Sequence, residues 1–421
     1  MFAAIICFGT GLTTISLLAQ TMARAEQLNE DIKQFVLVIP NLTGCFLRFY
    51  VGRGIAIEGG RKSALVCALL TFIGVLIMFI ALISKDISTL QSSDEQFAFL
   101  VIGSFLSGSA IANFQLIVEM VMWYPLEIAG TVQGIFAGVG NLFLGAFGLI
   151  LINCLQNGLS LIGGYIIVLV LLVITLPLTY IYLQKTPLTQ LIDQKMEENK
   201  ATIIAEFCGQ QNFPSKFHAL KSMRDIPTII ICLNYFFCFG GFLSISSYLK
   251  GYIMAYHKTT VYEALFQNFT FSCITSLTRV FTGYLTDKIT GFLSTQISLI
   301  IIIISSLILS FSQSNSPHSF MHIGGLLFLA IGIGFMMAGN YKWIVEIRYN
   351  HILAIGMLAG FFGALGGPIL QLTLFDESLA KGGQYLPLAF LFFTTLGIVI
   401  LIINQVLHID QIKKQKASMY K

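Results

Sequence analysis

The chain has 421 residues, of which 56% are hydrophobic and 10% are charged, and its formal net charge is +4. A typical soluble domain is about one-quarter charged, and a soluble fold of this length has too little interior to enclose so much apolar surface. This composition excludes a soluble enzyme and a disordered scaffold, and the small, dispersed positive charge excludes a nucleic-acid binder. The sequence therefore predicts an integral, multi-pass membrane protein with the lipid bilayer as a partner.

About 20 apolar residues are needed for a helix to cross the hydrocarbon core of a bilayer. The first such run, 2–21, lacks the basic start and the cleavage site of a signal peptide, so we interpret it as a span. The predicted fold class is an all-α membrane protein with 12 transmembrane helices, at 2–21, 35–55, 63–84, 97–122, 130–154, 160–183, 227–249, 262–285, 292–313, 319–345, 352–375 and 384–408.

A long polar stretch divides these runs six and six. We predict an N-terminal six-helix bundle over 1–183, a cytoplasmic linker over 184–226, and a C-terminal six-helix bundle with a short basic tail over 227–421. Placing both termini in the cytoplasm puts most Lys and Arg residues in the inside loops, as the positive-inside rule requires. We expect a monomer in the cell (inner) membrane.

The two halves are related by an internal repeat. Span two contains Arg48-x-x-x-Gly52, and span eight contains Arg279-x-x-x-Gly283, 231 positions later. Because each half has an even number of spans, both halves share one orientation and a pseudo-twofold axis along the membrane normal, as in the major facilitator fold. Three further pairs match in the same order: Cys7-Phe8-Gly9 with Cys238-Phe239-Gly240, Asn113-Phe114-Gln115 with Asn340-Tyr341-Lys342, and Gly134-x-x-Ala137-Gly138 with Gly356-x-x-Ala359-Gly360.

Two arginines inside spans are the sharpest functional signal. A charge at mid-span costs about 2.5–3.5 kcal/mol on an insertion scale, so such residues are candidates for function. Arg48 and Arg279 are repeat mates and can face each other across a central cavity, where they repel unless an anion lies between them. A planar guanidinium suits a planar oxyanion because it donates two parallel hydrogen bonds. The alternative is that each arginine pairs with a carboxylate and holds a helix contact.

Three further charges lie inside spans: Glu119, Glu346 and Lys342. Both glutamates are near the predicted cytoplasmic loops, so we expect them to form salt bridges with residues such as Arg61 that latch the halves; a proton relay is the alternative. Lys342 either adds positive charge to the cavity or extends toward the cytoplasm.

Glycines recur in spans five and eleven, where small residues allow close helix packing and gating motion. Asn141 is a polar residue among these glycines with two N–H donors, so it is a candidate anion ligand. The glycines selected for gating or packing are Gly138, Gly140, Gly145, Gly360, Gly363 and Gly367, and the aromatic residues selected as pocket lining are Phe8, Phe114, Tyr235, Phe239 and Tyr341.

Several of these motifs together resemble the nitrate/nitrite porters of the major facilitator superfamily. The resemblance implies that Arg48 and Arg279 clamp the anion from both sides. The chain also departs from that family: Ala56-Ile57-Glu58 stands where an aspartate is common, and Asn340-Tyr341-Lys342 replaces a run of small polar residues. The motifs that carry the resemblance are Ile39-Pro40-x-x-x-Gly44-x-x-Leu47-Arg48, Gly59-Gly60-Arg61-Lys62, Ala112-Asn113-Phe114, Gly134-x-x-x-Gly138-x-Gly140-Asn141, Tyr235-x-x-x-Phe239-Gly240, Leu277-Thr278-Arg279 and Gly360-x-x-Gly363-x-x-Gly366-Gly367; they further imply that Phe114, Asn141, Tyr235 and Phe239 line the site.

The resulting hypothesis is exchange of a small anion, nitrate or nitrite, by alternating access. An empty carrier must bring two arginines together without an anion, which disfavours its return and so favours exchange. An organic solute such as an amino acid or carboxylate is the alternative substrate, and a transport-inactive sensor or interaction protein is the alternative class. We expect no enzyme activity, cofactor or metal, because the sequence has no HExxH motif, no paired mid-span carboxylates, no Ser-His-Asp arrangement and no zinc-type cysteine spacing.

Overall fold

The computed structural model describes residues 1–25, 30–84, 94–184, 225–312, 319–348, 352–375, 381 and 385–419, and its regular structure there is helical. The first half of the chain, the N-half, contains α1 (Phe2–Arg24), α2 (Glu30–Glu58), α3 (Gly60–Ser84), α4 (Asp94–Ser107), α5 (Ser109–Ala112), η2 (Asn113–Gln115), α6 (Leu116–Met122), η3 (Leu126–Ile128), α7 (Ala129–Gln156) and α8 (Leu161–Tyr182). The second half, the C-half, contains α12 (Ile226–His257), α13 (Val261–Ile289), α14 (Gly291–Ser310), α15 (Phe320–Arg348), α16 (Ile352–Leu370), η5 (Gln371–Phe375) and α18 (Tyr385–Met419).

Eleven helical stretches in the described ranges are long and apolar enough to cross a bilayer. The remaining predicted span, 262–285, which is the eighth in chain order, is the long helix α13. It is less apolar than the others because it carries Glu263, Arg279, Asp287 and Lys288. The predicted all-α fold of two six-helix bundles is thereby confirmed. The predicted linker lies almost wholly outside the described residues, so the domain limits there stay a prediction.

Two predicted spans are not regular helices. Span 97–122 is divided into α4, α5, η2 and α6, with a 3₁₀ turn at Asn113–Gln115. Span 352–375 contains Pro368, which removes one backbone donor, and the helix continues as the π turn η5. Irregular turns inside helices are common at functional sites because they redirect side chains.

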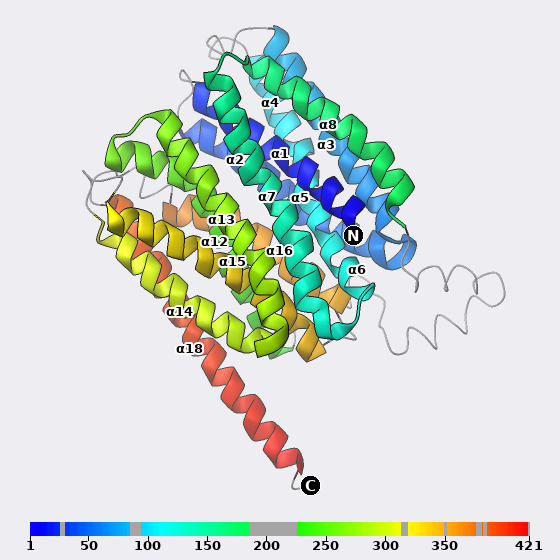
Figure 1. The fold of residues 1–421 in the computed structure, drawn as a ribbon, viewed down its shortest axis with the longest axis vertical. Helices are drawn as coiled ribbons and strands as arrows, with labels where there is room; N and C mark the ends of the chain where they lie inside the picture. The colour runs from blue at the N-terminus through cyan, green and yellow to red at the C-terminus, as the bar shows by residue number, and fades with distance from the viewer. Residues whose placement is uncertain are drawn as a thin grey trace, which may run out of the picture.

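The two halves meet along two main pairs of helices. α7 of the N-half packs against α13 of the C-half, and α2 of the N-half packs against α16 of the C-half. Within the C-half, α16 also packs along α12, and α15 contacts both α13 and α14. Figure 1 shows the N-half and C-half helices side by side, with α18 extending past the bundle to the C-terminus.

The contact between α7 and α13 depends on glycines. A Cβ atom added at Gly134 would lie 2.8 Å from the Arg279 carbonyl oxygen, and one added at Gly138 would lie 2.8 Å from the Ser276 carbonyl oxygen. At Gly145 the added atom would lie 2.7 Å from the Cys273 backbone nitrogen. These distances leave no room for a side chain. The predicted close helix packing at Gly138 and Gly145 is thus explained by the backbone of α13.

We expect Gly134→Ala to destabilise the protein, because the added methyl group meets backbone atoms that cannot rotate away. Overpacking of this kind costs about 1–3 kcal/mol, which lowers the melting temperature of the purified protein. Gly324→Ala on α15 is the matched control, since an added Cβ meets no atom within 4 Å there. Equal melting temperatures for the two variants would contradict a tight seam between α7 and α13.

Candidate functional site

Arg48 on α2 and Arg279 on α13 are both fully buried, at 0% exposure. Within the ranges that the structure describes, neither guanidinium forms an ion pair with a carboxylate. The interpretation in which each arginine holds a structural salt bridge is therefore not supported in those ranges. A buried charge without a counter-ion is costly, and this cost has to be offset by other interactions.

Arg48 is held by backbone oxygens and aromatic rings. Its Nη1 donates to the carbonyl oxygen of Gly360 on α16, which joins the two halves. Its Nη2 donates to the Ile111 carbonyl oxygen at 3.4 Å. The guanidinium carbon lies 4.9 Å from the ring centre of Phe114 and 5.1 Å from that of Phe239. These cation–π contacts stabilise the charge partly, while the Nε atom of Arg48 is buried with no hydrogen-bond partner in the described structure.

Arg279 is held by longer contacts. Its Nη2 lies 3.5 Å from both Gln133 Oε1 and the Tyr235 hydroxyl, and its Nη1 lies 3.5 Å from the Met337 sulfur. Its guanidinium carbon is 5.3 Å from the ring centre of Phe114. Its Nε atom is also buried without a partner among the described residues. The donors of Arg279 are therefore available to a stronger acceptor such as an anion.

Phe114 is the common neighbour of the two arginines and of the predicted aromatic residues. Its ring centre lies 5.4 Å from Phe239 and 6.3 Å from Tyr235, both in stacked arrangements. It meets Phe8 at 5.5 Å and Tyr341 at 5.8 Å, both edge to face. The structure thus brings together all five aromatic residues selected from the sequence. They form one aromatic layer beside the arginine pair.

A cavity opens on one side of this layer. Phe8, Phe239 and Asn141 are among the residues that line it. Asn141 is 2% exposed, and its Nδ2 has no hydrogen-bond partner in the described part of the chain. Neither arginine lines this cavity. Asn141 therefore lies in the cavity wall, and the aromatic layer separates the cavity from the guanidinium groups.

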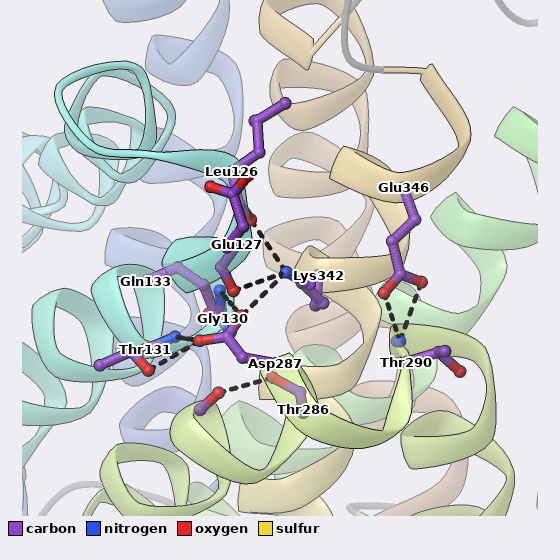
Figure 2. A network of polar contacts seen from close by, with 12 residues as sticks. Leu126, Glu127, Gly130, Thr131, Gln133, Thr286, Asp287, Thr290, Lys342 and Glu346 are labelled. Carbon is purple, nitrogen blue, oxygen red and sulfur yellow. Dashed lines mark hydrogen bonds and ion pairs between the residues drawn. The ribbon is translucent and has the colours of Figure 1, made fainter.

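Lys342 lies elsewhere, in a polar network between the halves that Figure 2 shows. Its Nζ forms an ion pair with Asp287 Oδ1 at 2.9 Å and donates to the Leu126 carbonyl oxygen at 3.0 Å. Asp287 on α13 accepts from the backbone nitrogens of Gly130 and Thr131, both at 2.7 Å, at the start of α7. We call Asp287, Lys342 and these partners the inter-half network. Of the two directions predicted for Lys342, its described contacts lie in the inter-half network, where Asp287 balances the charge of its ammonium group.

In the part of the chain that the structure describes, the hydrogen bonds of the two glutamates lie within their own halves, and the predicted salt bridges across the halves are not among them. Glu119 accepts from the Gly60 backbone nitrogen at 3.2 Å, and Glu346 accepts from the Gly291 backbone nitrogen at 2.9 and 3.0 Å. Gly60 and Gly291 begin α3 and α14, so each carboxylate caps a helix within its own half, where unpaired N–H groups favour an anion. Arg61 instead lies over the Tyr180 ring at 5.5 Å.

Repeat symmetry extends to these caps but not to the inter-half network. Gly60 and Gly291 are 231 positions apart, as are Arg48 and Arg279. The same offset places Ala56 opposite Asp287, so only the C-half supplies the aspartate. Comparing the two halves at this position could have identified Asp287 from the sequence.

The remaining glycines of the two motifs lie in different surroundings. A Cβ at Gly140 would meet the Phe8 ring within the N-half, and one at Gly367 would lie 2.9 Å from Leu243 Cβ on α12. Gly363 faces the Tyr235 ring, and Gly360 faces Arg48. These four positions therefore make room for residues of the arginine site or of its supporting helix.

Two glutamines near the arginines were not selected from the sequence: Gln133 and Gln115, both 0% exposed. Gln133 on α7 donates to the Ala338 carbonyl oxygen on α15 at 2.8 Å, while its oxygen faces Arg279. It therefore connects the site to both halves. Polar amides inside otherwise apolar spans were the available signal.

Comparison with known proteins agrees with this fold. A family model described as the Major Facilitator Superfamily matches residues 1–369. No curated protein shows significant sequence similarity to the chain. Among solved structures, the proton:xylose symporter XylE bound to 6-bromo-6-deoxy-D-glucose is similar with a TM-score of 0.65 and 16% identity, covering 95% of this chain and 92% of that one. The xylose transporter XylE from E. coli, in a partially occluded inward-open conformation, has a TM-score of 0.66 and 14% identity, covering 95% and 94%. At these identities the likeness shows the fold.

Proposed function

Because this chain belongs to the major facilitator superfamily, we propose that it is a secondary transporter that exchanges small planar oxyanions, nitrate and nitrite, by alternating access. One observation carries the proposal. Two fully buried guanidinium groups occupy equivalent positions in the two halves, have no carboxylate partner in the described ranges, and share the ring of Phe114.

The electrostatics favour an anionic substrate. Two positive charges near each other in a low-dielectric interior repel, and a bound anion converts this repulsion into attraction. Each guanidinium presents parallel N–H donors that match the oxygen atoms of a planar oxyanion. The unpartnered Nε atom of Arg279 is one such donor. The Nη2 group of Arg48, which makes only a 3.4 Å contact to the Ile111 carbonyl oxygen, is another.

The arrangement of cavity and network supports a route for the anion. With both termini in the cytoplasm, the cavity opens outward, because its lining includes Ala19 and Lys250 near the outer ends of α1 and α12. An entering anion would contact Asn141 first and then pass the aromatic layer to reach the arginines. The inter-half network closes the opposite, cytoplasmic end, and release on that side requires it to separate. This orientation, and a monomer in a cell membrane, are part of the proposal.

The surroundings of the site favour exchange over proton coupling. Proton relays within membranes use Asp, Glu or His, and the described contacts of Arg48 and Arg279 include none of these residues. When no anion is bound, closing the halves brings the two guanidinium groups together at an electrostatic cost. We therefore expect the loaded carrier to cross faster than the empty one.

Counterflow in proteoliposomes tests this function. Vesicles containing purified protein are loaded with nitrite, and isotopically labelled nitrate is added outside with ionophores that hold the pH and voltage gradients at zero. We expect labelled nitrate to accumulate inside, since outward movement of nitrite returns the carrier. Protein-free vesicles measure leakage. Absence of flux with nitrate and nitrite would contradict the proposal, and an amino-acid and carboxylate panel would then test the alternative substrates.

A further inference from the structure

Gln115 is the least explained polar residue beside the arginine site. It ends the 3₁₀ turn η2, directly after Phe114 in the middle of the fourth span. Its side chain is 0% exposed, and in the described structure neither Nε2 nor Oε1 has a hydrogen-bond partner. Leaving both ends of a buried amide unpaired is unfavourable, so a residue in this state calls for a functional explanation.

The amide of Gln115 lies next to Arg48. A Cβ atom added at Gly360 would be 2.9 Å from Gln115 Oε1 and 3.1 Å from Arg48 Nη1, so the two side chains flank the same point. A side chain at position 360 would occupy this space. Arg48 Nε is buried and unpartnered as well. Three polar atoms without partners are therefore gathered on the Arg48 side of the site.

The Arg279 side is built differently. Lys342, the repeat mate of Gln115, forms an ion pair with Asp287. Gln133 contacts Arg279 instead, but its Nε2 already donates to the Ala338 carbonyl oxygen. Of these two glutamines, only Gln115 has an amide NH₂ group with no hydrogen-bond partner in the described ranges.

We propose that Gln115 is a third ligand of the anion and that it favours nitrate over nitrite; this rests on the function proposed above. When the anion binds, the Gln115 amide oxygen accepts from Arg48 Nε, and the Gln115 NH₂ group donates to the anion. Two arginines can engage two oxygens, which is all that nitrite has, whereas nitrate presents a third oxygen for the amide. One arrangement thus satisfies all three unpartnered atoms.

Equilibrium binding of nitrate and of nitrite to the purified, full-length protein tests this role, measured by isothermal titration calorimetry. Gln115→Met keeps the volume and removes both amide groups. We expect its Kd for nitrate to rise about tenfold, corresponding to about 1.4 kcal/mol, while its Kd for nitrite changes less than about twofold. Retained nitrite binding also shows that the variant folds. Gln115→Asn, which keeps the amide but shortens its reach, provides the same readout if Gln115→Met does not fold.

Gln20→Met is the matched control. Gln20 on α1 is 2% exposed, and its Nε2 also has no partner in the described ranges, but it does not contact either arginine. Its replacement should leave both dissociation constants unchanged. If Gln115→Met weakens both anions equally, or neither, the role of Gln115 is contradicted while the arginine clamp stands. If the wild-type protein binds neither anion, the proposed function itself is overturned.

Discussion

Arg48→Lys and Arg279→Lys each abolish nitrate/nitrite counterflow while the protein remains folded: this is the largest effect that we expect. Lysine keeps the positive charge but loses the planar fork that matches an oxyanion. A hydrogen bond to a charged group contributes about 1.5–3 kcal/mol, so losing two of them lowers anion affinity at least about 100-fold. The measurements are counterflow in proteoliposomes and direct anion binding, each compared with the wild-type protein.

Arg61→Lys is the control for this pair of variants. Arg61 lies at the start of α3 against the Tyr180 ring, outside the aromatic layer and the cavity. Its replacement should leave counterflow unchanged. Melting temperature and size-exclusion profiles establish that Arg48→Lys and Arg279→Lys are folded. Near-normal counterflow by both lysine variants would refute the arginine clamp.

The second large effect is expected at the inter-half network. In Asp287→Asn, Lys342 keeps its charge but loses its counter-ion, and the side chains of both residues are less than 10% exposed, at 9% and 8%. Breaking a buried pair by removing one partner costs about 3–5 kcal/mol. Asp287 also caps α7, which belongs to the other half. The substitution therefore destabilises the conformation seen in this structure, in which the inter-half network holds the two halves together. We expect the closed conformation to be depopulated at least about 100-fold.

Alkylation of a reporter cysteine measures this shift. Ala338 is fully buried on α15, where its carbonyl oxygen accepts from Gln133 of α7, so separation of the halves exposes it. In the Ala338→Cys background, Asp287→Asn should increase the rate of maleimide labelling at position 338, quantified by mass spectrometry of that peptide.

Two further variants define what this result means. Lys288→Met removes a neighbouring charge that lies over the Tyr284 ring, outside the inter-half network, and should not change labelling. Asp287→Asn combined with Lys342→Met also removes the positive charge of Lys342, which Asp287→Asn alone leaves buried without a counter-ion. This double variant should restore slow labelling in part, because the uncompensated buried charge is the main cost of the single variant. Labelling of Asp287→Asn no faster than that of Lys288→Met would show that the network does not hold the halves together.

Much of the fold was determined by the sequence alone. Span length and the high cost of mid-span charge are local properties, so the apolar runs and the arginines could be identified without a structure. The internal repeat added long-range information, because it paired Arg48 in span two with Arg279 in span eight. The aromatic residues chosen as repeat mates also lie together around Phe114.

The partners of the polar side chains were decided only by the tertiary structure. From the sequence, the Lys342 side chain could point into the cavity or extend toward the cytoplasm. The carboxylate of Asp287, on another helix, determines where its ammonium group lies. Glu119 and Glu346 cap helix starts because the unpaired backbone N–H groups of Gly60 and Gly291 lie within hydrogen-bond distance of them. The 3₁₀ turn at Gln115 likewise depends on how the broken fourth span packs. A sequence identifies which side chains need a partner in a membrane, but the packing of helices distant in the chain determines which partner is within reach.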